Sequence, residues 1–186
     1  MLDHPDVAVQ AALFSAEECA AIIALAEAEA AAQGSLRDGM VRDQVRRSRI
    51  RWLPDGDAAS WVETRLLRFA AAAMRERFPF DLDGFEEHLQ VAEYRADDQG
   101  TYDWHSDRGW TGLAGRRKLT LVVQLTPPAH YAGGALELNP GGEVLTASPA
   151  IGDAVAFPSF VLHRVAPVTE GVRHSLAAWM HGAPFR

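Results

Sequence analysis

Cysteine is almost absent from this chain, and other common features are missing altogether. Cys19 is the only cysteine in 186 residues, which excludes a disulfide framework and zinc modules of the Cys₄ or Cys₂His₂ type. No run of about 18 apolar residues exists, so we expect no membrane-spanning helix. The first residues also lack the basic and apolar segments of a secretory signal. We therefore expect a cytoplasmic protein with no membrane partner.

Lysine is equally scarce, since Lys118 is the only one and arginine supplies nearly all the positive charge. The net charge of −7 argues against a protein that coats nucleic acid. Hydrophobic residues make up 48% of the chain and charged residues 23%, which argues against global disorder. The length suits one domain with a buried core, so we expect a single domain over residues 1–186.

Two helices are expected in the N-terminal third of the chain. Ser15 and Glu18 form a capping box, apolar residues then recur at helical spacing, and Gly34 offers a stop. A second helix is expected after Asp57, with an apolar face that extends as far as Met74.

Arginine alternates with other residue types in the segment between these helices. Arg47, Arg49 and Arg51 have the period of two that is typical of a strand, which we expect over residues 45–53. These arginines then share one solvent-exposed face. Contact with an acidic or nucleic-acid substrate is the alternative.

The pattern of residue types changes from residue 84 onward. Short β-like runs alternate there with turns rich in Gly, Pro, Asn and Asp, a pattern that favours a sandwich or barrel. We expect residues 10–83 to provide helical support and a first strand, and residues 84–182 to form a β-rich core. Strands are expected at His88–Tyr94, Leu119–Leu125, Ala135–Leu138, Val144–Ala147, Ala154–Phe157 and His174–Trp179.

An imidazole and a carboxylate stand two residues apart at His105 and Asp107. On extended backbone these two side chains point to the same side, and His163 is a plausible third ligand from a neighbouring strand. Two histidines and one carboxylate on one face of a metal are the ligand set of non-haem Fe(II) oxygenases. The His-x-Asp spacing alone is weak, because His4 and Asp6 match it at a terminus that we expect to fray.

A cation at a fixed distance strengthens the case for this metal site. Arg173 lies ten residues after His163, and no other histidine of the chain has an arginine or lysine at that spacing. Residues 167–171 are expected to form a turn, so that two antiparallel strands bring His163 and Arg173 to one pocket. A guanidinium there can form a bidentate pair with the distal carboxylate of 2-oxoglutarate. Ser175 shares the strand face of Arg173 and is a candidate for the same carboxylate.

Several stretches, in this order along the chain, resemble the prolyl 4-hydroxylase-like branch of the Fe(II)/2-oxoglutarate-dependent oxygenases. Together they cover roughly residues 10–182. The resemblance implies a double-stranded β-helix, which is a distorted, cupin-like jelly roll, with helices supporting one sheet. The matching stretches are Arg46–Trp52, Leu89–Tyr94, Gly100–Asp107, Arg117–Thr126, Tyr131–Leu138, Gly152–Pro158 and His163–Trp179.

The resemblance also implies roles for particular residues. By family analogy His105, Asp107 and His163 hold Fe(II), Arg173 binds the C5 carboxylate of 2-oxoglutarate, and Tyr94 matches the cosubstrate tyrosine. The branch often has a tyrosine where Gln124 stands; an amide there can donate to the carboxylate instead.

Other residues near these motifs have two readings. Trp110 is a candidate to line the substrate mouth, with ordinary packing as the alternative. His174 is expected to point away from the site and to be exposed, and Trp179 to pack beneath the site.

The reaction implied is oxidative decarboxylation of 2-oxoglutarate by O₂ coupled to hydroxylation of a substrate C–H bond, with ascorbate as a candidate reductant. A nucleic-acid dealkylase on the same fold and a non-catalytic, cupin-like domain that binds a metal or ligand are the alternatives. A prolyl residue of a protein or peptide, a free amino acid and another small molecule all fit as substrates. The sequence leaves the oligomeric state open.

Overall fold

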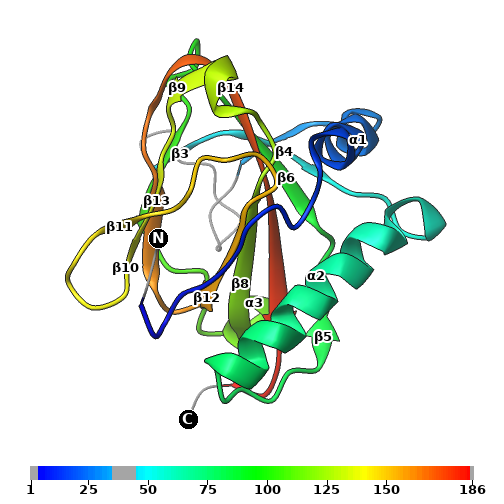
Figure 1. The fold of residues 1–186 in the computed structure, drawn as a ribbon, viewed down its shortest axis with the longest axis vertical. Coiled ribbons are helices and arrows are strands. Elements are labelled where there is room, and N and C mark those ends of the chain that lie inside the picture. Colours follow the sequence, from blue (N-terminus) through cyan, green and yellow to red (C-terminus); the bar gives the residue numbers. More distant parts are fainter. Residues whose placement is uncertain (1–3, 35–44, 185–186) are drawn as a thin grey trace.

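The structure is a computed structural model that describes residues 4–34 and 45–184. Two antiparallel sheets face each other, and helices cover the outer face of the larger sheet (Figure 1). This arrangement confirms the expected β-rich, double-stranded β-helix with supporting N-terminal helices. Within the described residues no helix is long and apolar enough to cross a bilayer.

The larger sheet contains four of the strands expected from the sequence, those near residues 88–94, 119–125, 154–157 and 174–179. Its order is β1-β12-β8-β14-β6-β4-β2, and β5 and β9 pair with β14 outside this path. The strands are β1 (Ala8–Gln10), β2 (Ala32–Gln33), β4 (Arg49–Trp52), β5 (Gly84–Phe85), β6 (Gln90–Arg95), β8 (Arg117–Gln124), β9 (Tyr131–Gly133), β12 (Ala154–Pro158) and β14 (Val168–His181).

The smaller sheet has the order β11-β10-β13-β7-β3. Two short helical turns, α3 (Gly112–Arg116) and η1 (Pro128–His130), lie in connections between strands. The strands of this sheet are β3 (Arg46–Arg47), β7 (Thr101–His105), β10 (Leu136–Asn139), β11 (Leu145–Thr146) and β13 (Leu162–Val165).

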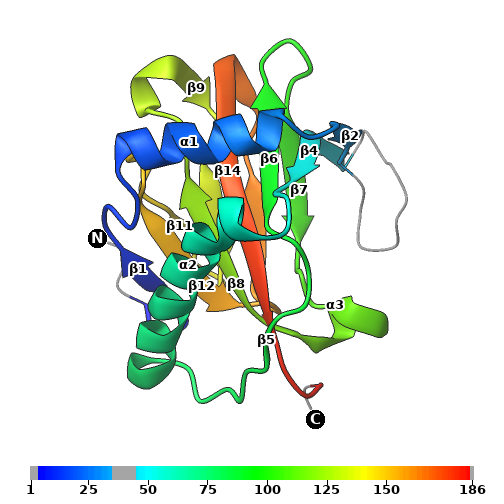
Figure 2. The ribbon, with the colours of Figure 1, turned by 90° about the vertical axis from the view of Figure 1, so that its right-hand side faces the viewer.

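Helices α1 (Ala16–Glu27) and α2 (Asp57–Glu76) lie across the outer face of the larger sheet (Figure 2). The capping box of α1 is present as expected, with the Ser15 side chain accepting from the Glu18 backbone. The helix ends at Glu27, so the expected stop at Gly34 is wrong. Strand pairing explains the difference, because β2 pairs with β4 and the Gly34 N–H donates to the Ser48 carbonyl over 2.7 Å.

The expected continuous strand over residues 45–53 is interrupted at Ser48. β3 belongs to the smaller sheet and β4 to the larger one, so this segment crosses from one sheet to the other. The exposed arginine face is also smaller than expected. Arg49 and Arg51 both form ion pairs with the buried Glu93 of β6, and Arg49 also pairs with Asp98.

The expected turn over residues 167–171 is also wrong, because residues 168–171 form the start of β14 and pair with β9. β13 and β14 are not paired with each other and lie in opposite sheets. Only Ala166 and Pro167 separate these two strands. His163 and Arg173 therefore approach each other across the space between the sheets, and not along a hairpin.

The alternation along β8 shows how the core is divided. Leu119, Leu121 and Val123 are fully buried and pack with α1 and α2 in the outer core. Thr120 and Val122 point the other way, into the space between the sheets. A second apolar cluster that includes Leu138 and Phe157 fills much of that space, and the remaining volume forms the candidate site.

Candidate functional site

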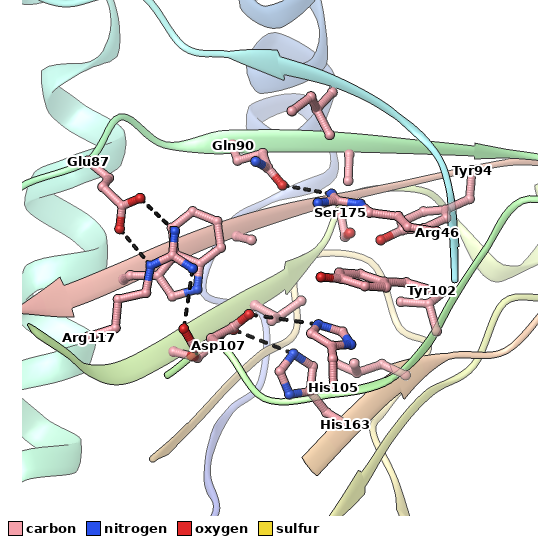
Figure 3. A pocket seen from close by; sticks show the side chains of 18 of the residues that line it. Arg46, Glu87, Gln90, Tyr94, Tyr102, His105, Asp107, Arg117, His163 and Ser175 are labelled. Atoms are coloured by element: carbon pink, nitrogen blue, oxygen red, sulfur yellow. Dashed lines mark hydrogen bonds and ion pairs between the residues drawn. The ribbon is translucent and has the colours of Figure 1, made fainter. Parts of the chain in front are cut away.

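A cavity of about 280 Å³ lies between the two sheets, and residues from both sheets line it (Figure 3). His105, Asp107 and His163 lie on one side of it, and Arg173 lies deeper, on the opposite sheet. The cavity therefore brings together four of the residues that the sequence singled out. Tyr94 and Ser175 also line it.

His105, Asp107 and His163 converge on one point. His105 ends β7 and pairs directly with His163 on β13, while Asp107 follows in the next turn. The Asp107 carboxylate oxygens lie 3.7 Å from His105 Nε2 and 3.4 Å from His163 Nε2. One ligand atom from each residue lies within 4.8 Å of the other two, which is a spacing that one metal ion can bridge.

Backbone carbonyls fix the orientation of both imidazoles. His105 Nδ1 lies 2.7 Å from the Asp103 carbonyl oxygen, and His163 Nδ1 lies 3.1 Å from the Val161 carbonyl oxygen. A carbonyl only accepts, so each Nδ1 carries the hydrogen and each Nε2 presents a lone pair toward Asp107. Metal-binding histidines are commonly held in this way.

The charges of the three side chains also suit a cation. Burial and the neighbouring His163 lower the pKa of His105 to about 3, so this imidazole is neutral at neutral pH. Burial alone would raise the pKa of Asp107, but the two imidazoles and Arg117 outweigh it and hold the pKa well below its usual range. Two imidazole nitrogens and one carboxylate on one side of the point match an Fe(II) centre with open positions.

Thr120 orients the Asp107 carboxylate from the opposite sheet. Its hydroxyl lies 2.9 Å from Asp107 Oδ2 and 3.1 Å from the Ser159 hydroxyl. Thr120 is 1% exposed and Ser159 fully buried, so water does not replace these contacts. The carboxylate is thus held in one direction before any metal binds.

Arg173 is a buried cation without an ion-pair partner among the described residues. It is 2% exposed, and its guanidinium lies 5.6 Å from the Tyr94 ring and 3.5 Å from the Ser175 hydroxyl. Burial lowers its pKa, although the phenols of Tyr94 and Tyr131 partly offset that effect. A buried charge is costly unless it is paired, so this guanidinium is suited to an anionic ligand.

Gln124 does not line the cavity that contains His105, Asp107 and His163, which we call the metal-side cavity. Gln124 lines a second cavity behind Arg173, where its amide nitrogen donates to the Tyr131 hydroxyl over 3.0 Å and to the Thr126 carbonyl over 3.1 Å. Trp110 also lies outside the metal-side cavity. Its side chain is 86% exposed, with the Arg108 guanidinium 5.5 Å from its ring.

Two expectations about β14 need correction. His174 does point away from the site, but its side chain is only 14% exposed because it packs beside Glu93 and Thr126 on the outer face of the sheet. Trp179 does not pack beneath the site but forms part of the cavity wall. Its indole N–H is buried without a well-formed hydrogen bond and contributes to the low pKa of Asp107.

Sequence reasoning missed the wall around Arg117. The Arg117 guanidinium lies 4.0 Å from the Trp179 ring, pairs with Glu87 and contacts the Asp107 carbonyl oxygen over 3.4 Å (Figure 3). Continued alternation from Thr120 would turn residue 118 inward. A register shift at this end of the β8–β14 pairing turns Arg117 inward instead, and the sequence carries no signal for it.

The opposite wall, around Arg46, was also missed. Arg46 is 6% exposed, donates to Gln90 over 2.9 Å and lies 4.6 Å from the centre of the Tyr102 ring. Tyr102 in turn stacks on His105 with ring centres 3.4 Å apart. The spacing of Tyr102 and His105 was visible in the sequence, but the contact with Arg46 depends on the pairing of β3 with β7.

Curated relatives of the chain are PKHD-type hydroxylases. The protein from Acidovorax ebreus is 39% identical over 88 residues, which are 45% of this chain and 39% of that protein. The protein from Parvibaculum lavamentivorans is 34% identical over 128 residues, or 67% of this chain and 53% of that protein. The chain spans about half or less of the lengths of these relatives.

Solved structures and a family model complete the comparison. A prolyl-4-hydroxylase from Pseudomonas putida has a TM-score of 0.76 at 24% identity and covers 95% of this chain and 93% of its own. A Trichoplax adhaerens prolyl hydroxylase, in complex with a peptide fragment, has a TM-score of 0.80 at 16% identity, covering 97% and 85%. Residues 89–181, which contain the three converging side chains and Arg173, match the model of the 2OG-Fe(II) oxygenase superfamily. The chain belongs to that superfamily.

Proposed function

We propose that this protein is an Fe(II)- and 2-oxoglutarate-dependent dioxygenase that hydroxylates a C–H bond. His105, Asp107 and His163 hold the iron, and Arg173 binds the distal carboxylate of 2-oxoglutarate. The observation that carries the proposal is the meeting of these four side chains in one cavity, with three ligand atoms within 4.8 Å and the guanidinium buried nearby. A site for a metal alone does not need the buried cation.

The chain's own residues provide binding, orientation and exclusion of water. When bound, the iron supplies the activation of O₂, and the reaction consumes 2-oxoglutarate, O₂ and R–H to give succinate, CO₂ and R–OH. One carboxylate and two imidazole ligands would leave a bound divalent metal with net positive charge, which would attract the 2-oxo acid. Tyr94 and Ser175 flank Arg173 and are proposed as further contacts of the cosubstrate. Burial of this wall keeps competing water from the reacting centre.

For the substrate we propose a prolyl residue of a peptide, or an amino-acid-like molecule. The Trp179 ring offers an apolar surface on the Asp107 side of the cavity, and Arg117 beside it offers N–H donors. This pair suits a small saturated ring that is joined to a carbonyl oxygen. The similarity to PKHD-type and prolyl hydroxylases supports the same class. We also propose that the protein is located in the cytoplasm.

The two alternatives have less support. A nucleic-acid dealkylase would use the arginine strand, but Arg49 and Arg51 are already neutralised by Glu93 and Asp98. A non-catalytic metal-binding domain leaves the buried Arg173 unexplained. The non-catalytic domain remains an outcome of the test below.

The test measures succinate formed from 2-oxoglutarate with Fe(II) and O₂, with proline-containing peptides and free proline as substrates. Each reaction is run with and without ascorbate as the candidate reductant. We expect substrate-dependent succinate and a product heavier by one oxygen atom. His105→Ala removes both signals, while His88→Ala, an exposed histidine paired with Asp55, leaves them unchanged. Metal-dependent thermal stabilisation with no effect of 2-oxoglutarate would instead favour the non-catalytic domain.

A further inference from the structure

A second cavity of about 770 Å³ lies behind Arg173. Arg173, Val122 and Leu136 line both this cavity and the metal-side cavity, so these three residues form the wall between them. Gln124 and Tyr131 approach Arg173 from the rear cavity only. In the rear cavity, Gln124 and Tyr131 therefore lie near the Arg173 guanidinium, which we propose binds the distal carboxylate of 2-oxoglutarate.

The fold fixes Tyr131 beside that guanidinium. Tyr131 begins β9 and pairs with Gly171 at the start of β14, two residues before Arg173. The backbone then turns through Gly133 and Gly134, whose φ angles of 73° and 64° favour glycine. A Cβ atom at residue 134 would lie 2.9 Å from Arg173 Cδ and 3.5 Å from Tyr131 Cε2. The segment thus packs directly on the arginine.

The hydrogen bonds of Gln124 decide which group can donate to a bound carboxylate. The Gln124 amide nitrogen donates to the Thr126 carbonyl and to the Tyr131 hydroxyl. The carbonyl can only accept, so the position of this nitrogen is fixed and both of its hydrogens are used. Gln124 then has only an acceptor oxygen left, which a carboxylate would repel. The Tyr131 oxygen accepts from Gln124, and its own hydrogen remains for another acceptor.

We propose that the Tyr131 hydroxyl donates to the distal carboxylate of 2-oxoglutarate alongside Arg173, and that Gln124 is a positioning residue that orients this phenol. The proposal rests on the proposed function. The related oxygenases often have a tyrosine at the position of Gln124 on β8. In this chain the phenol beside the carboxylate would instead come from Tyr131 on β9. Under this proposal the Tyr131 hydroxyl, and not the Gln124 amide, contacts the carboxylate.

The test measures binding without turnover, by calorimetric titration of the Mn(II)-loaded protein. The ligands are 2-oxoglutarate and 2-oxovalerate, in which a methyl group replaces the distal carboxylate. Tyr131→Phe should weaken 2-oxoglutarate binding by about 10- to 100-fold, the range for a lost hydrogen bond to a charged group. Binding of 2-oxovalerate should change by less than about twofold. Equal losses for both ligands, or no loss for either, would overturn the proposal.

Gln124→Met tests the positioning role, since it keeps the length of the side chain and removes both hydrogen bonds. We expect a smaller selective loss of 2-oxoglutarate binding, and no further loss when Gln124→Met is added to Tyr131→Phe. Additive losses would show that Gln124 contacts the carboxylate directly. If the unaltered protein binds 2-oxoglutarate no better than 2-oxovalerate, the proposed function fails. If it does discriminate but Tyr131→Phe discriminates equally well, only the role of Tyr131 fails.

Discussion

Thr120 offers a way to test whether the metal site depends on orientation of Asp107. Its buried hydroxyl contacts Asp107 Oδ2 over 2.9 Å from the opposite sheet. Thr120→Val keeps the shape of the side chain and removes this hydroxyl and its contact with Ser159. The carboxylate then loses the hydrogen bond from the Thr120 hydroxyl, while both imidazoles keep their backbone hydrogen bonds.

Two magnitudes follow from this geometry. Loss of a hydrogen bond to a buried charged group should lower the free energy of unfolding by about 1.5–3 kcal/mol. Groups that orient metal ligands typically change metal affinity by about 10- to 100-fold when removed. We therefore expect Thr120→Val to bind Mn(II) or Co(II) about 10- to 100-fold more weakly in competition with a chelator.

Thr126→Val is the matched control for this experiment. Thr126 is also a buried threonine of the same region, and its hydroxyl accepts from the His174 backbone N–H over 2.8 Å. It should lose a comparable amount of stability and keep the metal affinity of the unaltered protein. Unchanged metal affinity in Thr120→Val, or an equal loss in both variants, would refute the argument that Thr120 acts through Asp107.

Two further outcomes are expected. Glu87 has a pKa of about 2, because hydrogen bonds from Arg117 and His181 outweigh the effect of burial. This low pKa stabilises the folded protein above pH ~4.5 by up to about 3 kcal/mol. The stabilisation is lost as the pH falls from ~4.5 toward ~2. The difference in urea-unfolding free energy between the unaltered protein and Glu87→Gln should shrink over that interval, and a constant difference would contradict this assignment. Trp110→Ala should change the unfolding free energy by less than about 0.5 kcal/mol and leave metal binding intact, because the side chain is 86% exposed; a clear loss in thermal denaturation would show that Trp110 packs against the domain.

Local signals in the sequence predicted much of this fold. The capping box at Ser15 fixes the start of α1, and the alternation along β8 predicts which residues face the helices. The convergence of His105 and Asp107 was predicted from strand geometry, whereas Arg173 was selected by its spacing from His163 on a hairpin that the structure does not contain. Their roles remain proposals, but the structure does bring all four to one cavity.

The features that sequence reasoning missed depend on pairing between distant segments. α1 ends early because Ala32 and Gln33 pair with β4, and no residue of the helix itself signals this. The position of Arg117 depends on a register shift against β14. Tyr131 is close in sequence to Gln124, but its contact with Arg173 follows from the pairing of β9 with β14. Single-sequence patterns carry no information about such partners.

The crossing at Ala166 and Pro167 has a consequence for attempts to re-engineer the substrate range. These two residues carry the chain between sheets, and the Ala166 N–H, the Pro167 carbonyl and the Val168 N–H are all hydrogen-bonded to the backbone. Even one inserted residue there would shift His163 relative to Arg173. Residues 141–144 are all exposed and join β10 to β11, so grafted segments belong at that connection.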